Sequence, residues 1–450
     1  MNYLRYRKKR LTSFQIIIFG FLLVILTGSI LLMLPVSSRD GKATSFLDAL
    51  FTAVSATCVT GLVVHDTATY WSYFGQAVIL LLIQIGGMGV VTIAVSLAAI
   101  SGKRIGLMQR STMQEAIAAP SVGGIVRLTG FILKSTILIE LTGAVLMLPA
   151  FWKDFGGLKG IWYALFHSIS AFCNAGFDLM GRKEPFSSLT EYSANALVNA
   201  VIIGLIITGG IGFLTWDDIK CKGIHIRKYR MQSKVVLSMA AILIIFPFLL
   251  FYFGEFTRPV WNGMSVKEKL LSALFQAVTP RTAGFNTIDL TLFSEAGQTI
   301  IIILMLTGGS PGSTAGGMKT TTLAVLFLTL LSVFKRKEDT ECFGRRLDEG
   351  TIKNAAAILL MYLTLFLTGG ILISCIEDLP MRICLFETAS AIGTVGLTLG
   401  VTPELGTVSR LILILLMFLG RVGGLTLVFA AFSGKVRNIT KLPREKITVG

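Results

Sequence analysis

One short stretch occurs four times in this chain, and each copy ends in a glycine followed by leucine or phenylalanine. A glycine lets the backbone turn its carbonyl groups where a side chain would clash, and carbonyl oxygens can replace the hydration shell of a cation. The four glycines lie 115, 108 and 112 residues apart, so the repeated unit has the size of a domain. Four such units around one axis would form an ion filter. The glycines are Gly61, Gly176, Gly284 and Gly396.

The residues that lead into the four glycines include no acidic side chain. Coordination by carbonyl groups without carboxylates favours a large monovalent cation, potassium first, over calcium or sodium. We therefore expect K+ to bind at the four glycines. The predicted filter consists of Thr57, Cys58, Val59, Thr60 and Gly61 in the first copy, Cys173, Asn174, Ala175 and Gly176 in the second, Thr282, Ala283 and Gly284 in the third, and Gly393, Thr394, Val395 and Gly396 in the fourth.

Three aspartates follow three of these glycines at short distances in the sequence. They are Asp66, Asp178 and Asp289. Carboxylates at such positions could concentrate cations at the outer mouth of a pore. They could equally be ordinary solvated acids of surface loops, and the sequence leaves both interpretations open.

A second glycine-rich run, from residue 307 to residue 317, contains five glycines and one proline. Each glycine costs a helix about 1 kcal/mol and proline about 3 kcal/mol relative to alanine, so no continuous helix is expected there. Backbone groups freed at membrane depth must face water or protein, which favours a loop beneath the filter and in the pore path. We predict that this loop gates the pore. The predicted gate comprises Thr307, Gly308, Gly309, Ser310, Pro311, Gly312, Ser313, Thr314, Ala315, Gly316, Gly317 and Arg421.

Arg421 occupies the position in the fourth repeat where the first two repeats have Gly87 and Gly210. A charge at that depth is too costly to face lipid, so we expect its side chain to point inward, to the carbonyl groups of the loop or to the cavity. The alternative is that Arg421 only ties two helices together. The glycine pairs of the first two repeats could likewise serve only close helix packing.

These residues require membrane-spanning helices to position them. The chain is 53% hydrophobic and only 15% charged, and several apolar runs exceed the roughly 20 residues that cross a bilayer. Each repeat has the order of a long helix, a half-length helix, the glycine stretch and a second long helix. We therefore predict an all-α polytopic membrane protein. Four parallel helix–pore-helix–filter–helix repeats, with eight spanning helices, would surround one pseudo-fourfold pore.

The repeats and spans follow from the apolar runs. We expect the repeats at 11–101, 125–214, 235–334 and 354–432, between a cytoplasmic N-terminus at 1–10 and a cytoplasmic C-terminus at 433–450. First spans are expected at about 11–36, 125–150, 235–256 and 354–376, and second spans at about 74–101, 191–214, 297–334 (broken at 307–317) and 404–432. The half-length helices carry start signals: Ser45 with Asp48 and Ser265 with Glu268 have capping-box spacing, and Pro380 suits a first helical turn.

The formal net charge of +16 would suggest nucleic-acid binding in a soluble protein. However, 26 of the 41 lysines and arginines fall in five segments that would lie on one face of the membrane. This distribution follows the positive-inside rule and places both termini in the cytoplasm of a multi-pass cell-membrane protein. The lipid bilayer, and no nucleic acid, is therefore the expected partner of these charges.

Two buried polar candidates remain within the apolar segments. Glu140, inside a first span, must face protein or water, and we favour a partner in a neighbouring span over a transport role. His167 lies in the second half-length helix and is expected to be packed or hydrogen-bonded. The six cysteines form no metal-binding spacing and imply no disulfide framework.

Two other kinds of function compete with a cation pore. A secondary carrier for another small solute would place its site at helices broken by glycine, and it would need parallel repeats without re-entrant half-length helices. A membrane enzyme is the weaker alternative. Gly308–Gly312 matches a nucleophile-elbow pattern, but it follows a membrane helix rather than a strand.

The fourfold plan resembles the Trk/Ktr/HKT superfamily of potassium transporters over residues 11–434, and it is most similar to the Ktr-type (KtrB-like) membrane subunit. The resemblance is carried by the four filter glycines, by the run Thr307–Lys319 and by Arg421. Glycine at position 61 resembles the potassium-selective members rather than those with serine. Asn174 and Arg281 depart from a threonine–glycine filter and leave a poorly selective K+/Na+ transporter as an alternative.

The resemblance also implies partners that the residues alone do not reveal. It implies a homodimer with one pore per subunit and a cytoplasmic ring of nucleotide-binding regulatory subunits of the Ktr/RCK type. Na+ stimulates some relatives. No organic cofactor is expected in this chain.

Overall fold

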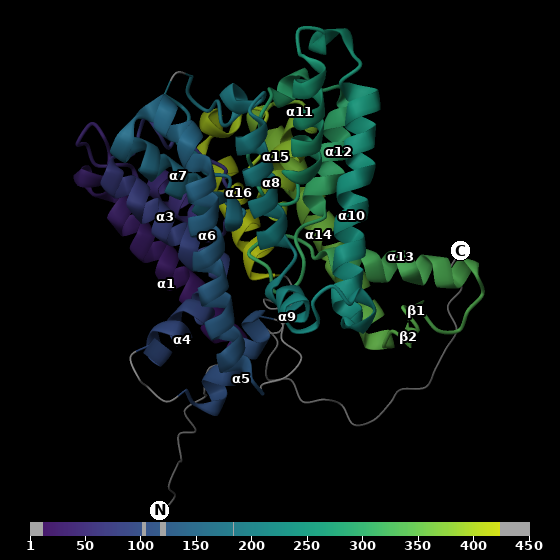
Figure 1. Cartoon of the computed structure of the whole chain (residues 1–450). Coiled ribbons are helices and arrows are strands. Elements are labelled where there is room, and N and C mark those ends of the chain that lie inside the picture. The colour runs from purple at the N-terminus through teal and green to yellow at the C-terminus, as the bar shows by residue number, and fades with distance from the viewer. Residues whose placement is uncertain (1–11, 101–104, 118–122, 183, 424–450) are drawn as a thin grey trace, which may run out of the picture.

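The computed structural model of the chain describes residues 12–100, 105–117, 123–182 and 184–423, and this part is mostly helical (Figure 1). The expected cytoplasmic N-terminus at 1–10 and C-terminus at 433–450 lie outside the described residues. The helices are α1 (Ser13–Met33), α2 (Phe46–Thr57), α3 (Tyr73–Met88), α4 (Val90–Ile100), α5 (Leu107–Ile117), α6 (Ile125–Phe155), α7 (Gly157–Phe172), α8 (Ala196–Gly210), α9 (Phe213–Lys222), α10 (Met231–Leu250), α11 (Val266–Val278), α12 (Glu295–Leu306), α13 (Thr320–Phe334), α14 (Glu349–Glu377), α15 (Met381–Gly393) and α16 (Thr407–Val422). A two-stranded antiparallel hairpin, β1 (Glu341–Cys342) and β2 (Arg345–Arg346), precedes α14.

The first helix of each repeat is long and apolar. By length and composition, α1, α6, α14 and α10 with its continuation to Glu255 could each cross a membrane. Each of these helices packs against the half-length helix of its own repeat. One end differs from the expectation, because α6 continues through Pro149 to Phe155 instead of ending near residue 150.

The second helices are bent or interrupted, where continuous spans were expected in the first two repeats. The α3–α4 pair bends by 95° and the α8–α9 pair by 96°. The bends follow Gly89 and Gly212, whose φ angles of 86° and 88° only glycine adopts readily. Counting each bent pair as one span gives up to six candidate spans among the described residues. Two further spans were expected. One corresponds to α12 with α13, which a loop interrupts, and the other to α16. The expected range of this last span, to residue 432, runs beyond the described residues.

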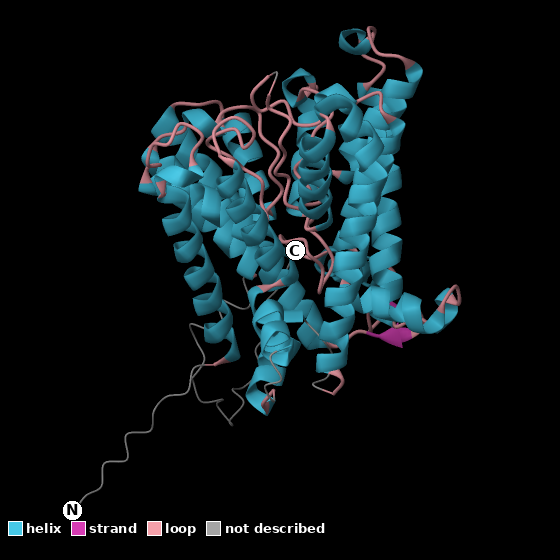
Figure 2. Cartoon of the chain, turned by 60° about the vertical axis from the view of Figure 1, so that its left-hand side comes forward, coloured by secondary structure: helices cyan, strands magenta, loops and turns pink. Residues whose placement is uncertain are grey.

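The half-length helices α2, α7, α11 and α15 all lead into a glycine stretch. Ser45 caps α2, Ser265 and Glu268 form a complete capping box on α11, and Pro380 is the N-cap of α15 rather than part of its first turn. In each helix, the phenylalanine of a repeated leucine–phenylalanine pair is at most 1% exposed. These residues are Phe51, Phe166, Phe275 and Phe386. The half-length helices are therefore anchored in the protein core, and Figure 2 shows loops descending between the helices in the upper half of the molecule.

Candidate functional site

The structure brings the four repeated glycines together in a closed ring. A Cβ atom on Gly61 would lie 2.5 Å from the carbonyl oxygen of Ala175, and one on Gly176 would lie 2.8 Å from that of Ala283. In the same way, a Cβ atom on Gly284 would clash with the carbonyl oxygen of Val395, and one on Gly396 would clash with that of Thr60. Each repeat thus contacts the next around one axis, and the fourth returns to the first. No side chain fits between neighbouring segments.

The backbone of the ring is held in an unusual conformation. The residue two places before each glycine has a left-handed backbone although it is not glycine. These residues are Val59 (φ 57°), Asn174 (φ 58°), Thr282 (φ 70°) and Thr394 (φ 51°). Such residues cost roughly 1–3 kcal/mol each and persist where the surrounding structure imposes them, commonly at functional sites.

Several side-chain oxygens around the ring are buried and have no hydrogen-bond partner among the described residues. They belong to Thr57, Thr60, Asn174, Thr282 and Thr394. Buried polar atoms normally find a partner in protein, water or a bound ligand. These oxygens therefore keep acceptor capacity that the described protein atoms do not use.

Hydroxyl groups of the half-length helices hold the ring from behind. Ser55 Oγ accepts the Gly61 N–H at 3.1 Å, and Ser390 Oγ accepts the Gly396 N–H at 3.0 Å. In the other two repeats the hydroxyl donates to the carbonyl after the glycine: Ser170 to Phe177 at 2.7 Å, and Thr279 to Phe285 at 2.5 Å. These hydroxyl groups were not among the residues that the sequence predicted for the filter. Their signal is a serine or threonine five or six residues before every repeated glycine.

The ring forms the floor of a small outer cavity of about 60 Å³, which all four glycines line. Asp66 and Asp178 lie in its wall, whereas Asp289 is exposed and caps a short 3-10 helix. Asp66 also joins two outer loops, because it accepts the N–H groups of Ala68 and Phe186 at 3.0 and 2.9 Å. Burial raises the pKa of Asp178 to about 7, and the nearby carboxylate of Asp66 adds to the rise. Two of the three aspartates are thus placed at the mouth, and the third is an ordinary loop acid.

The loop between α12 and α13 lies directly against the inner end of the filter segments. Thr314 Oγ1 donates to the Phe172 carbonyl at 3.0 Å and accepts from Asn174 Nδ2 at 3.1 Å. A Cβ on Gly316 would clash with Thr394 Oγ1. The loop therefore touches the filter segments of both the second and the fourth repeats.

Backbone hydrogen bonds connect the same loop to the second helices of its neighbours. The N–H groups of Ser310 and Thr314 donate to Gly210 and Gly209 at 3.0 and 3.3 Å, and the Gly317 N–H donates to Gly420 at 3.1 Å. A single repeat thus supplies a loop that is bonded to two other repeats through its own backbone.

Arg421 adds the connection to the remaining repeat. Its Nη1 donates to the Thr314 carbonyl of the loop, and its Nη2 donates to the carbonyls of Gly86 and Gly87, the latter at 3.2 Å. The guanidinium therefore points inward to the loop, as one interpretation of the sequence expected. It also ties α16 to the end of α3, so Arg421 does more than join two helices.

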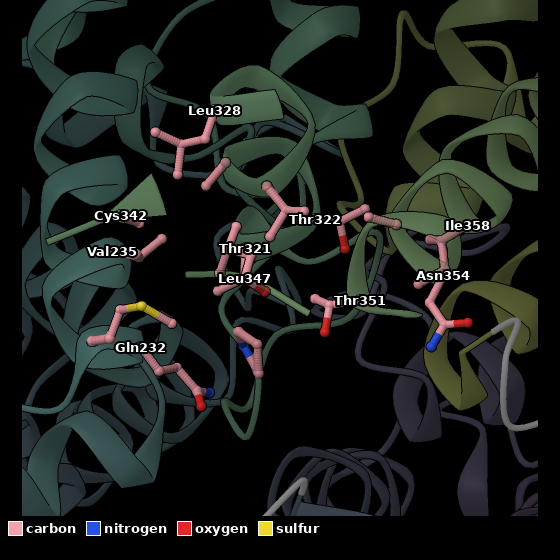
Figure 3. Close-up of a pocket in the computed structure, with 15 residues that line it drawn as sticks. Gln232, Val235, Thr321, Thr322, Leu328, Cys342, Leu347, Thr351, Asn354 and Ile358 are labelled. Carbon is pink, nitrogen blue, oxygen red and sulfur yellow. The ribbon is translucent and has the colours of Figure 1, made fainter. Parts of the chain in front are cut away.

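Two cavities flank the loop, and Pro311 lines both of them. One, of about 350 Å³, lies beneath the filter and is lined by Lys319, Arg421 and Glu115 among others. The other, of about 580 Å³, is lined by side chains of α10, α13 and α14, including Val235, Thr322 and Asn354 (Figure 3). The loop is therefore bordered by space on two sides.

The remaining expectations concern packing. A Cβ on Gly86 or Gly209 would clash with the last carbonyls of α2 and α7, so close packing is confirmed as a role of the two glycine pairs. Glu140 accepts a hydrogen bond from Gln84 of α3 at 3.2 Å, which confirms a partner in a neighbouring helix. His167 is fully buried, and its Nδ1 is hydrogen-bonded to the Tyr163 carbonyl at 2.7 Å, as expected.

The fold and the ring define a class: a membrane cation transport protein built of four pore-forming repeats. A family model described as TrkH, cation transport protein, matches residues 4–438, and the chain belongs to this family. The resemblance to Trk and Ktr potassium transporters is thereby confirmed. The carrier alternative required repeats without half-length helices, and every repeat of this chain has one.

Individual relatives cover almost the whole chain. It is 41% identical over 420 residues to the potassium/sodium uptake protein NtpJ of Enterococcus hirae, with 92% of each chain covered. It is 40% identical over 415 residues to the Ktr system potassium uptake protein B of Bacillus subtilis, again with 92% of each chain covered. The crystal structure of the potassium transporter TrkH from Vibrio parahaemolyticus shares the fold, with a TM-score of 0.73 at 19% identity over 94% of this chain and 86% of that chain.

Proposed function

We propose that this protein takes up potassium across the cell membrane as the ion-conducting subunit of a Ktr-type system. The observation that carries the proposal is the closed ring of four glycines, with unpartnered buried oxygens around it and no acidic side chain in it. A hydrated K+ would exchange its water for these carbonyl and hydroxyl oxygens. The half-length helices direct the negative ends of their dipoles at the ring, which favours a cation there.

The loop 307–317 is the gate of this pore in our proposal. It lies against the inner side of the ring, and its hydrogen bonds to the second and fourth repeats hold it there. Conduction requires that it move aside, and the two cavities that Pro311 lines offer the space. Arg421 stabilises the closed arrangement.

The orientation and the partners belong to the same proposal. Both termini would be cytoplasmic, the chain would form a homodimer with one pore per subunit, and a cytoplasmic ring of nucleotide-binding subunits would move the loop. The name of the B. subtilis relative, a Ktr system protein, supports a multi-component assembly. Impermeant thiol reagents test the orientation, because cysteines at exposed Lys42 and half-buried Lys269 should react from outside and one at exposed Arg345 only from inside.

A transporter that conducts both K+ and Na+ is the second candidate. The relative from E. hirae is named for both ions, and Asn174 and Val59 interrupt the hydroxyl side chains of the ring. Uptake into proteoliposomes decides between the two, with K+, Rb+ and Na+ gradients and a proton-gradient control. Uptake of K+ and Rb+ with little Na+ supports the first candidate, and equal uptake of K+ and Na+ supports the second. No uptake of any of these ions would overturn both.

A further inference from the structure

One position of the four half-length helices, directly after the leucine–phenylalanine pair, carries a polar side chain in every repeat. It lies nine residues before the repeated glycine, or eight in the third repeat, which lacks one residue. All four side chains are at most 1% exposed. A buried polar group in an apolar environment is costly unless it forms hydrogen bonds, so this recurrence calls for a function. The residues are Thr52, His167, Gln276 and Glu387.

In the fourth repeat this side chain holds the segment that follows the filter. Glu387 Oε1 accepts the Leu399 N–H at 3.1 Å and the Thr398 hydroxyl at 2.5 Å. Its Oε2 accepts the Thr402 hydroxyl at 2.7 Å. Three donors from the outer loop therefore converge on one carboxylate that is 0% exposed.

In the second repeat, a different side chain makes the equivalent bond. His167 Nε2 accepts the Leu179 N–H at 3.2 Å, while its Nδ1 is bonded to the Tyr163 carbonyl. Leu179 and Leu399 each lie three residues after the repeated glycine. The same backbone N–H is thus held by the same helix position in two repeats.

The first and third repeats lack this bond. The Thr52 hydroxyl donates to the Asp48 carbonyl of its own helix at 2.9 Å. Neither amide atom of Gln276 has a hydrogen-bond partner among the described residues. Because the ring runs in the order one, two, three and four, the two held segments lie on opposite sides of the pore.

We propose that Glu387 and His167 are positioning residues that hold the outer ends of two opposed filter segments and thereby set the discrimination between K+ and Na+. The inference rests on the proposed function, because it assigns a selectivity role at the same ring. Ser170 and Ser390 fix each of these segments close to the glycine, and the outer hydrogen bonds fix it three residues further on. A segment held at two points keeps its carbonyl groups at the spacing that suits the larger ion.

The test is the ratio of K+ to Na+ uptake in proteoliposomes containing the full-length protein. Glu387→Ala and His167→Ala should each lower this ratio about fivefold, the effect of about one lost hydrogen bond. Thr402→Val, which removes one donor and leaves Glu387 in place, should lower it in the same direction. Thr52→Val is the matched control, because it changes the same helix position where no outer segment is held, and its ratio should equal that of the wild type.

Glu387→Gln separates positioning by hydrogen bonds from the effect of charge, because an amide oxygen can still accept the Leu399 N–H. We expect this variant to retain most of the wild-type ratio. A glutamine variant as unselective as the alanine variant would overturn the hydrogen-bond clamp, as would wild-type ratios in Glu387→Ala, His167→Ala and Thr402→Val. If the wild-type protein takes up neither ion, the proposed function fails; if it is selective and all variants match it, only the present inference fails.

Discussion

The ring of glycines and the loop beneath it lie in contact but are built in different ways. Every repeat contributes one glycine to the ring, with a serine or threonine behind it. The loop comes from the third repeat alone, and its bonds to the other repeats differ from one another. A symmetric ring can surround an ion equally from four sides, whereas a single loop can move without distorting that ring. In our proposal, the repeated part therefore selects the ion and the unrepeated part regulates its flow.

The largest effect is expected where a side chain enters the ring. In Gly61→Ser, the new Cβ would lie 2.5 Å from the Ala175 carbonyl, and φ at this position is 92°. The displaced carbonyls should admit more sodium, and we expect the K+/Na+ uptake ratio to fall about tenfold, equivalent to about 1.4 kcal/mol. Rb+ uptake in competition with Na+ measures this ratio.

Gly204→Ser is the control for this substitution. Gly204 lies in α8, and nothing lies within 4 Å of a Cβ built there. Its K+/Na+ ratio should match that of the wild type. Unchanged discrimination after serine substitution at all four ring glycines would contradict the assignment of selection to the ring.

A change in the loop should alter the rate rather than the selectivity. Deletion of Gly309–Ala315 removes the Thr314 contacts with the filter and the backbone bonds to α8. We expect K+ flux to rise about fivefold and to depend less on the regulatory subunit, because the closed state loses its bonds. Flux with and without that subunit measures both effects. If a well-folded deletion protein transports at the wild-type rate and remains fully regulated, the gate lies elsewhere.

The difference between ring and loop also separates what the sequence could predict from what it could not. The half-length helices and ring glycines were predictable because four copies repeat the same local signals, such as the serine caps of α2 and α11. The bend after Gly89 was not predictable, because the sequence does not distinguish a glycine that adopts a φ of 86° from a glycine that serves helix packing. The bonds of Arg421 to Thr314 and Gly86 join segments far apart in the chain, so only the fold could show that this residue contacts both the loop and a neighbouring helix.

A smaller effect should follow from a single hydroxyl of the loop. Thr314→Val loses the hydrogen bonds with Phe172 and Asn174 but retains the shape of the side chain. Weakening the closed loop by less than the full worth of two hydrogen bonds should raise K+ flux about threefold. Ser313→Ala is the matched control, because the Ser313 hydroxyl bonds only within the loop, to the Ser310 carbonyl at 2.7 Å. If Thr314→Val transports K+ no faster than Ser313→Ala, the contact with the filter does not hold the loop.

The smallest expected effect concerns the outer mouth, where the charge of Asp178 depends on pH. Because burial raises its pKa to about 7, the carboxyl group is mostly ionised at an external pH of about 8 and mostly protonated at about 6. The ionised form attracts cations to the cavity above the ring, so acidification should raise the KM for K+ about twofold and leave the maximal rate unchanged. Asp178→Asn should remove the pH dependence. At every pH, its KM should equal the KM that the wild type shows at low pH. Asp289→Asn, at an exposed site outside the cavity, should keep the wild-type profile. A pH profile that persists in Asp178→Asn would mean that this carboxylate does not supply the pH-dependent attraction at the mouth.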